Sequence, residues 1–179
     1  MVVGKSPLPG GWGDANAGGF LSRELKRSGY DAIFFTGKAV TPTWLDITEQ
    51  SITFHDATDL WGKDIIETER LIKDKIEDKW TQIASIGKGG ETLSRISGIA
   101  TDRGRIAARS GLGAVMGAKN LKAVAFHGQA KIPVARPDVL KSINRKFLEA
   151  YKKSKLYDRL TVRYMHTVSK LIARTGISV

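Results

Sequence analysis

Short apolar stretches predict β-strands in the first three quarters of the chain. Residues 43–48 and 51–55 each alternate apolar and polar positions on either side of the polar pair Glu49-Gln50, which is typical of a β-hairpin. Short apolar runs predict four further strands, at residues 31–35, 82–86, 93–99 and 121–126.

Helical spacing predicts two helices among these strands. Residues 19–28 carry apolar side chains on one side and end before Gly29, which suits a helix C-terminus. Residues 63–78 place isoleucines on one face, and Glu69 and Lys73 form an i,i+4 pair on the other. Because helices and strands do not alternate strictly, the pattern predicts an α+β fold rather than repeated βαβ units.

The last part of the chain is predicted to be helical, after a boundary at residues 131–137. Pro137 suits the first position of a helix, and a second helix is predicted over residues 156–175 with Gly176 at its C-cap. Each helix carries one apolar stripe. The stripes are Leu140, Ile143, Phe147 and Tyr151, then Leu160, Tyr164, Val168 and Ile172.

Composition narrows the chemistry. The 179 residues are 41% hydrophobic and 26% charged, as in ordinary globular proteins, and they include no cysteine. These residues therefore supply no thiolate nucleophile, no disulfide and no ligand for a zinc ribbon or an iron–sulfur cluster. There is no apolar run of about 18 residues, so we expect a cytoplasmic protein that does not span a membrane.

The net charge of +11 raises the question of nucleic-acid binding. Residues 131–179 hold 12 of the 29 basic residues and only 3 of the 18 acidic ones, so the excess charge belongs to the helical tail. A basic nucleic-acid-binding module remains an alternative of a different class, although we expect no nucleic-acid partner. Its affinity would fall steeply with salt.

Glycine clusters occur in four segments, at residues 4–19, 87–91, 103–113 and 117–120. Such clusters either form tight turns or let backbone N–H groups approach a phosphate. The spacings match neither a Walker-type nor a Rossmann-type loop. The third segment also holds Arg103, Arg105 and Arg109, which either clamp phosphate groups or form a solvated charged turn.

Longer motifs carry a more specific signal when they are taken in order. They are Gly4-Lys-Ser-Pro-Leu-Pro-Gly, Asn16-Ala-Gly-Gly-Phe, Gly29-Tyr-Asp-Ala-Ile, Leu60-Trp-Gly-Lys, Ile83-Ala-Ser-Ile-Gly and Gly111-Leu-Gly-Ala-Val-Met-Gly-Ala-Lys-Asn-Leu-Lys-Ala-Val-Ala. Over residues 2–134 the chain resembles the tungsten-containing aldehyde ferredoxin oxidoreductase family. The resemblance implies an internally duplicated α+β N-terminal domain that carries a bis-pyranopterin tungsten or molybdenum cofactor.

The resemblance also implies particular binding residues. The pterin-binding Asn-x-Gly of the family falls on Asn16 and Gly18. Its second pterin-binding segment falls on Arg105, Ile106, Ala107, Ala108 and Arg109. Asn16 and the carbonyl of Ile106 would also help to hold a magnesium ion that bridges the pterin phosphates. No catalytic residue is expected within this chain.

The implied domains are a partial cofactor-binding domain at residues 1–134 and the start of a helical middle domain at 135–179. The chain then resembles an internal fragment, inactive alone, of an enzyme that oxidises aldehydes to carboxylates. Electrons would pass through the pterin-bound metal and a 4Fe-4S cluster, ligated outside this chain, to ferredoxin. A fragment of the tungsten subunit of a dearomatising aryl-CoA reductase is the alternative. The remaining partners would be the rest of the parent chain or a complementary subunit, and possible further copies in a homo-oligomer.

Overall fold

The computed structural model describes residues 1–175, without the side chains at 153, 155–160, 162, 165–166 and 168–175. The chain divides into two compact units, residues 1–132 and residues 133–179. Each unit is described by itself.

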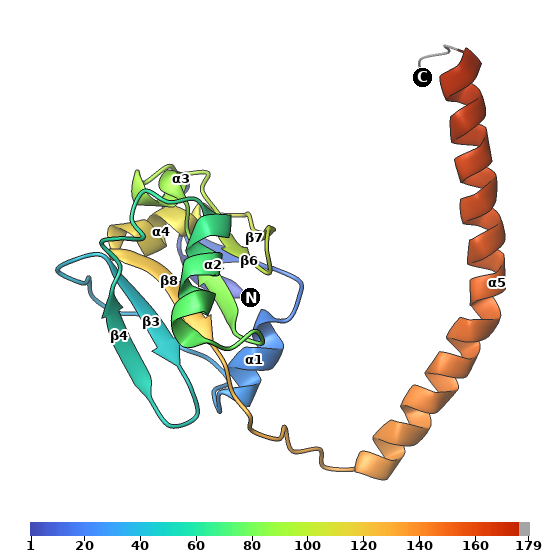
Figure 1. The fold of residues 1–179 in the computed structure, drawn as a ribbon, viewed down its shortest axis with the longest axis horizontal. Coiled ribbons are helices and arrows are strands. Elements are labelled where there is room, and N and C mark those ends of the chain that lie inside the picture. The colour runs from blue at the N-terminus through green and yellow to red at the C-terminus, as the bar shows by residue number, and fades with distance from the viewer. Residues whose placement is uncertain (176–179) are drawn as a thin grey trace. The chain divides into compact units, whose positions relative to one another are not determined.

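The first unit is built on one mixed sheet and one small hairpin (Figure 1). Its elements are β1 (Val2–Lys5), β2 (Trp12–Ala15), α1 (Leu21–Arg27), β3 (Thr43–Ile47), β4 (Ile52–Asp56), α2 (Ile65–Ile76), β5 (Gln82–Ser85), α3 (Lys88–Glu91), β6 (Ile99–Thr101), β7 (Arg105–Ala107), α4 (Leu112–Ala118) and β8 (Leu121–Phe126). The six-stranded sheet has the order β4-β3-β8-β5-β6-β7, in which β3 and β8 are parallel and the other neighbours antiparallel. The first unit is therefore α+β, as the sequence predicts.

Both faces of the large sheet are covered. On one face Leu45, Val124 and Phe126 belong to a core cluster that also takes in residues of α4, with side chains of α1 packed against it. On the other face Trp44 and Ala123 pack with Ile72 of α2. The two clusters lie on opposite faces because successive strand residues point in opposite directions.

Several predicted elements are confirmed. The hairpin is formed by β3 and β4, which pair from Thr43 with Asp56 to Ile47 with Ile52. The predicted strands at 82–86 and 121–126 correspond to β5 and β8, and the two predicted helices to α1 and α2. Asp64 caps α2 by accepting the backbone N–H groups of Ile66 and Glu67 at 2.9 and 2.8 Å.

Two predicted strands are wrong. Residues 31–35 form no strand, and Phe34 is 86% exposed, because in this run only Ile33 reaches the core. Most of the segment 93–99 is a turn that contains Leu93 at a positive φ of 60°, and the strand β6 begins only at Ile99. Local apolar content favoured a strand at both places, whereas the backbone finds no sheet neighbour there.

The sequence reasoning missed β1, β2, β7, α3 and α4, all of which lie in glycine-bearing segments. In α3 and α4 the glycines serve close packing of backbones. A Cβ at Gly117 would lie 2.0 Å from the carbonyl oxygen of Gly90, and one at Gly113 would lie 2.5 Å from that of Gly98. At these glycines the interpretation as tight structural packing fits, and only residues without a side chain allow it.

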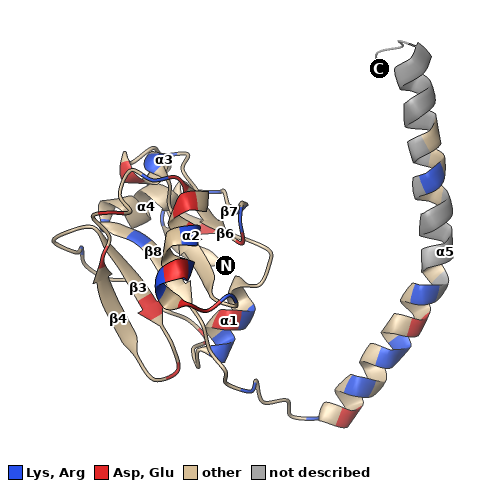
Figure 2. Ribbon diagram, in the orientation of Figure 1, with Lys and Arg blue, Asp and Glu red and all other residues tan. Residues whose placement is uncertain are grey.

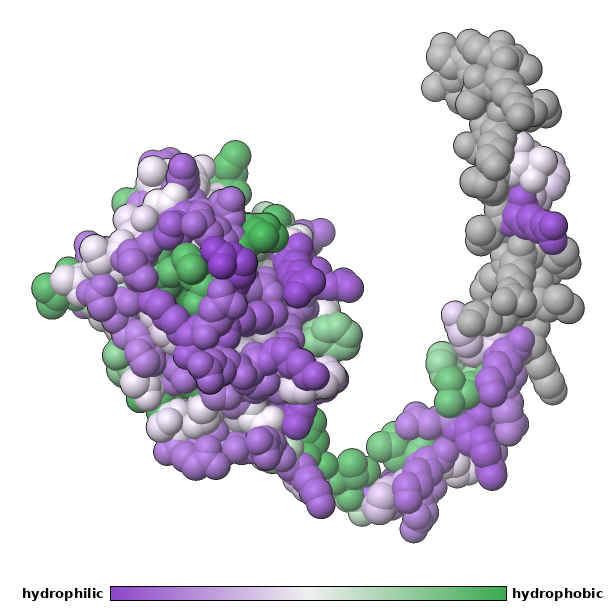
Figure 3. Space-filling view, in the orientation of Figure 1, coloured by the Kyte–Doolittle hydropathy of each residue, from purple (hydrophilic) through white to green (hydrophobic). Residues whose placement is uncertain are grey.

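The second unit contains one long helix, α5 (Pro137–Thr175). Pro137 is its first residue, as predicted, but the two predicted tail helices are a single continuous helix. Lys and Arg side chains are spread along its described part (Figure 2), and apolar side chains such as Ile143 and Phe147 are exposed on it (Figure 3). The predicted C-cap Gly176 lies outside the described residues.

Within the part of the chain that the structure describes, no helix combines the length and the apolar character that a membrane span needs.

Candidate cofactor-binding site

The arginine-bearing segment begins in a tight hairpin turn between β6 and β7. Asp102 and Arg103 both have positive φ angles, 47° and 58°, and the N–H of Gly104 donates to the carbonyl of Thr101 at 3.1 Å. Gly104 follows with a φ of 121°, so three consecutive residues with positive φ form the loop between the paired residues Thr101 and Arg105. The turn sets the direction in which Arg105 leaves the sheet edge.

The asparagine–glycine segment lies against this turn, between the end of β2 and the start of α1. The backbone N–H of Phe20 donates to Oδ2 of Asp102 at 2.7 Å. Gly19 has a φ of +100°, and a Cβ there would lie 1.5 Å from the same carboxylate oxygen. Glycine is therefore required at position 19 by both the backbone angle and the space that Asp102 occupies.

Arg105 takes the neighbouring place on this segment. A Cβ at Gly18 would lie 3.3 Å from Nη1 of Arg105, so the guanidinium rests on the bare backbone of that glycine. The two adjacent glycines thus make room for two side chains of the β6–β7 hairpin. Asp102 lies over Gly19, and Arg105 extends from Gly19, where a Cβ would lie 2.8 Å from its Cδ, to Gly18. The structure brings together two sequence segments that are about 90 positions apart in the chain.

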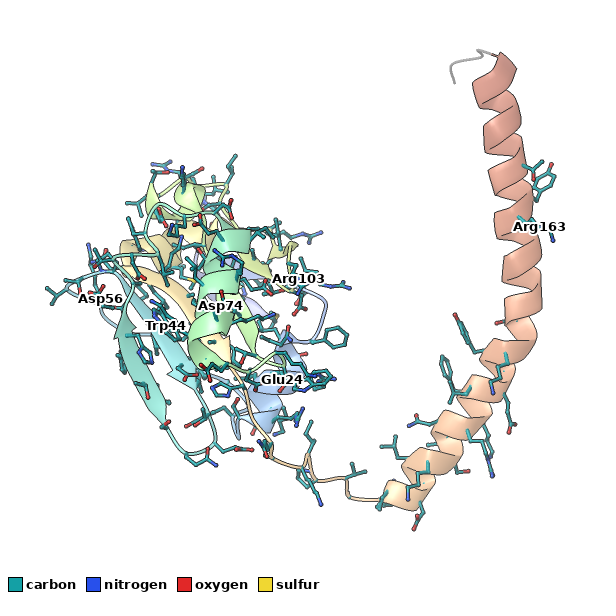
Figure 4. All side chains as sticks on the ribbon, in the orientation of Figure 1. Glu24, Trp44, Asp56, Asp74, Arg103 and Arg163 are labelled. Carbon is teal, nitrogen blue, oxygen red and sulfur yellow. The ribbon has the colours of Figure 1, made fainter. Side chains whose placement is uncertain are left out.

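The basic groups here are not neutralised by partners. The side chains of Arg103 (labelled in Figure 4), Arg105 and Arg109 are exposed and form no ion pair or hydrogen bond with the described residues. A planar guanidinium offers several N–H donors in a fork that suits phosphate oxygens. The site can therefore hold an anionic group without first breaking an internal salt bridge.

Two serines attach the segment after β7 to the β1–β2 hairpin. The hydroxyl of Ser110 donates to the carbonyl of Asp14 at 3.2 Å, and that of Ser6 donates to the carbonyl of Ser110 at 2.9 Å. A Cβ at Gly13 would lie 2.8 Å from Cβ of Ser110, which shows how closely the strand approaches. The Asn16 end of β2 is thereby fixed beside the arginine segment.

A buried carboxylate on α2 supports the turn from its other side. Oε2 of Glu69 accepts the backbone N–H of Arg103 at 3.0 Å, while Oε1 pairs with Nζ of Lys73 at 2.6 Å. The sequence predicts the Glu69–Lys73 pair, and the pair is present. The pair does not lie on a solvent-facing side of α2, because Glu69 is only 7% exposed and faces the turn.

The predicted binding residues differ in how accessible they are to a ligand. Asn16, Gly18, Arg105, Ala108 and Arg109 are exposed, and Ile106 is 48% exposed on β7 at the edge of the sheet. Ala107 is completely buried in the core, so it offers neither its side chain nor its backbone to a ligand at the surface. Of the named residues, Gly18 and Arg105 are neighbours in space, and the side chains of Asn16 and Arg109 make no hydrogen bond within the described residues.

Sequence reasoning gave no role to Asp102, Glu69 or Gly19. A signal exists for Asp102, because the run Asp102-Arg103-Gly104 is typical of a tight turn. The role of Glu69 has no local signal, since it depends on where α2 packs against the sheet.

A metal held only by side chains is not indicated. Within the described residues no group of three or more His, Asp or Glu side chains is arranged to hold a metal ion. A metal at this site would need other donors, such as backbone carbonyls or atoms of a cofactor.

A family described as "Aldehyde ferredoxin oxidoreductase, N-terminal domain" matches residues 1–128. The tungsten-containing aldehyde ferredoxin oxidoreductase of Pyrococcus horikoshii is 42% identical over 153 residues, covering 86% of this chain and 25% of that protein. The protein of the same name from Pyrococcus furiosus is 46% identical over 134 residues, covering 75% of this chain and 22% of that protein. The chain thus spans about a quarter of the length of these curated relatives.

A solved structure has the same fold over most of the chain. It is the active-site complex BamBC of benzoyl coenzyme A reductase with 1,5-dienoyl-CoA, at 35% identity and a TM-score of 0.73. The match covers 80% of this chain and 21% of that one.

Proposed function

The chain belongs to the aldehyde ferredoxin oxidoreductase family through its N-terminal domain, and from this premise we propose that it binds the phosphate-bearing pterin of a tungsten cofactor. The observation that carries the proposal is the unpaired guanidinium of Arg105 resting on the bare backbone of Gly18. An exposed cation beside an exposed glycine backbone suits a ligand that is both anionic and flat.

The chemistry of the donors fits such a group. Arg105 and Arg109 would hold phosphate oxygens, and Gly18 and Ala108 would present backbone to the pterin, while Ala107 anchors the segment between them in the core. Since β7 is an edge strand, alternate carbonyls along it face away from the sheet. The carbonyl of Ile106 and the amide of Asn16 are oxygen donors of the type magnesium accepts, and we assign them to a magnesium ion at the phosphates.

The bound cofactor would supply two-electron redox chemistry at its metal. The work of this chain is to bind and orient. Arg105 fixes the phosphate end of the group, the glycines allow close approach, and Asn16 positions the magnesium. The hairpin and the strand end that carry these donors are tied together by hydrogen bonds, so the backbone beneath them is positioned before the cofactor arrives.

For the complete protein we propose oxidation of aldehydes to carboxylates, with electrons passing through a 4Fe-4S cluster, ligated outside this chain, to ferredoxin. The names of the relatives support the aldehyde substrate and ferredoxin. A dearomatising aryl-CoA reductase is a second candidate, supported by the similarity to benzoyl coenzyme A reductase. In either case the partner of this chain is the remainder of a larger enzyme.

A chimeric enzyme tests the cofactor assignment. Residues 1–128 would replace the matching segment of the Pyrococcus furiosus relative, and tungsten and pterin would be quantified per chain. We expect Arg105→Ala to lose most of the cofactor, because a charge-assisted phosphate contact disappears. Arg70→Ala is the matched control, since Arg70 is an exposed arginine on α2 that pairs with Asp74. Undiminished cofactor in a folded Arg105→Ala chimera would refute the assignment.

A further inference from the structure

Asp102 lies just before the proposed cofactor-binding residues 105–109, and cofactor binding as proposed does not use it. Its Oδ2 accepts the N–H of Phe20, and its Oδ1 is buried without a hydrogen-bond partner among the described residues. One oxygen of the acid is therefore desolvated, which is costly unless the contact has a use.

Glu69 acts on the same turn through the same kind of bond. It accepts the N–H of Arg103, the residue next to Asp102, and its remaining charge is balanced by Lys73. Arg103 has a positive φ of 58°, which is unfavourable for a residue with a side chain. One carboxylate thus holds the backbone of the turn against α2, and the other joins the turn to the start of α1.

We propose that Asp102 and Glu69 are positioning residues that keep the β6–β7 turn in its left-handed form and thereby hold Arg105 over Gly18. Neither carboxylate touches the cofactor in this scheme. Without Asp102 the residues 18–20 lose their bond to the turn, and without Glu69 the backbone of Arg103 is free to leave the positive-φ region. The turn ends at Gly104, and Arg105 is the next residue. Either change therefore displaces its guanidinium.

The inference rests on the proposed cofactor function, but its structural part can be tested separately. In the 179-residue chain, amide hydrogen exchange would be measured at Phe20 and Arg103. We expect Asp102→Ala to accelerate exchange at Phe20 by roughly tenfold or more, because a bond to a charged acceptor is lost. Asp102→Asn keeps an acceptor oxygen and should stay within about threefold of the parent chain.

At the amide of Arg103 we expect Glu69→Ala to accelerate exchange to a similar extent, and Glu69→Gln to leave it close to that of the parent chain. Asp56→Ala is the control, since Asp56 accepts the N–H of Thr58 at 2.8 Å in a turn that follows β4, and it should leave both amides unchanged. Exchange at Phe20 that is unaffected by Asp102→Ala, or equally fast in Asp102→Asn, would overturn the positioning role.

The chimeric enzyme then connects the turn to the cofactor. We expect Asp102→Ala to lower tungsten and pterin per chain at least twofold, Asp102→Asn to restore them, and Asp56→Ala to leave them unchanged. If Arg105→Ala loses the cofactor while Asp102→Ala keeps it, the positioning inference fails and the proposed function stands. If Arg105→Ala keeps the cofactor, the proposed function fails, and the exchange experiment alone decides whether the carboxylates hold the turn.

Discussion

At the scale of single residues, Lys122 is the strongest case of a polar group used for structure. Its side chain is fully buried, and Nζ donates to the carbonyls of Lys63 and Ile86 at 2.9 and 2.8 Å and pairs with Glu91 at 2.5 Å. Burial lowers the pKa of Lys122 below its ordinary value, and the carboxylate of Glu91 opposes that shift. All three ammonium protons therefore have acceptors, which ties β8 to α3 and to the loop before α2.

Replacing Lys122 by methionine should destabilise the first unit by about 3–5 kcal/mol, because the buried carboxylate of Glu91 loses its charge partner. Urea unfolding followed by circular dichroism measures the change. Lys119→Met is the control, since Lys119 is only partly buried and its Nζ makes one bond, to the carbonyl of Gly37. Equal stability of the two variants would show that the buried pair contributes nothing.

The proposed cofactor-binding residues also show how much of the site can be predicted from the sequence. Arg105 and Gly18 are both identifiable from the sequence, one as a cation in a glycine-rich segment and the other through a family motif. That they lie side by side depends on Asp102, which lies over Gly19, and on a turn with three consecutive positive φ angles. Such contacts between distant segments follow from tertiary packing, so the pairing could not be predicted from local pattern.

At the scale of elements, the sequence predicts those whose apolar pattern is regular. The β3–β4 hairpin and α2 follow directly from periods of two and of about 3.6 residues. By contrast α4, with the sequence Leu-Gly-Ala-Val-Met-Gly-Ala, contains two glycines that disfavour a helix in isolation. Both glycines are nonetheless needed, because a side chain at Gly117 would collide with Gly90 of α3 and one at Gly113 with the backbone of Ser97 and Gly98.

Gly117→Ala should therefore destabilise the first unit by about 1–3 kcal/mol, although alanine is the better helix former. The new methyl group would lie 2.0 Å from the carbonyl oxygen of Gly90, which is backbone and cannot rotate away. Gly89→Ala provides the comparison, because its Cβ would meet Cβ of Ser97 at an ordinary 3.7 Å. Thermal unfolding of both variants measures the difference, and a Gly117→Ala midpoint at or above that of Gly89→Ala would contradict the packing argument.

At the scale of the whole molecule, the two units differ in how they are stabilised. Every buried residue of both core clusters lies between Ala15 and Phe126, so the first unit contains its own core. The helix α5 instead exposes apolar side chains such as Leu140, Ile143 and Phe147 at 44–67% of their surface. A basic amphipathic helix of this kind gains little stability by itself, since most helical stability comes from packing of the apolar face.

We therefore expect residues 1–132, prepared without the second unit, to unfold cooperatively at a midpoint within about 2 °C of that of the 179-residue chain. Near-ultraviolet circular dichroism, which reports the packing of buried Trp44, should be unchanged because that side chain is 3% exposed and surrounded by residues of the first unit. Far-ultraviolet signal should fall by the contribution of α5. A truncated chain without a cooperative transition would mean that the two clusters do not suffice, and that residues 133–179 supply part of the stability of the first unit.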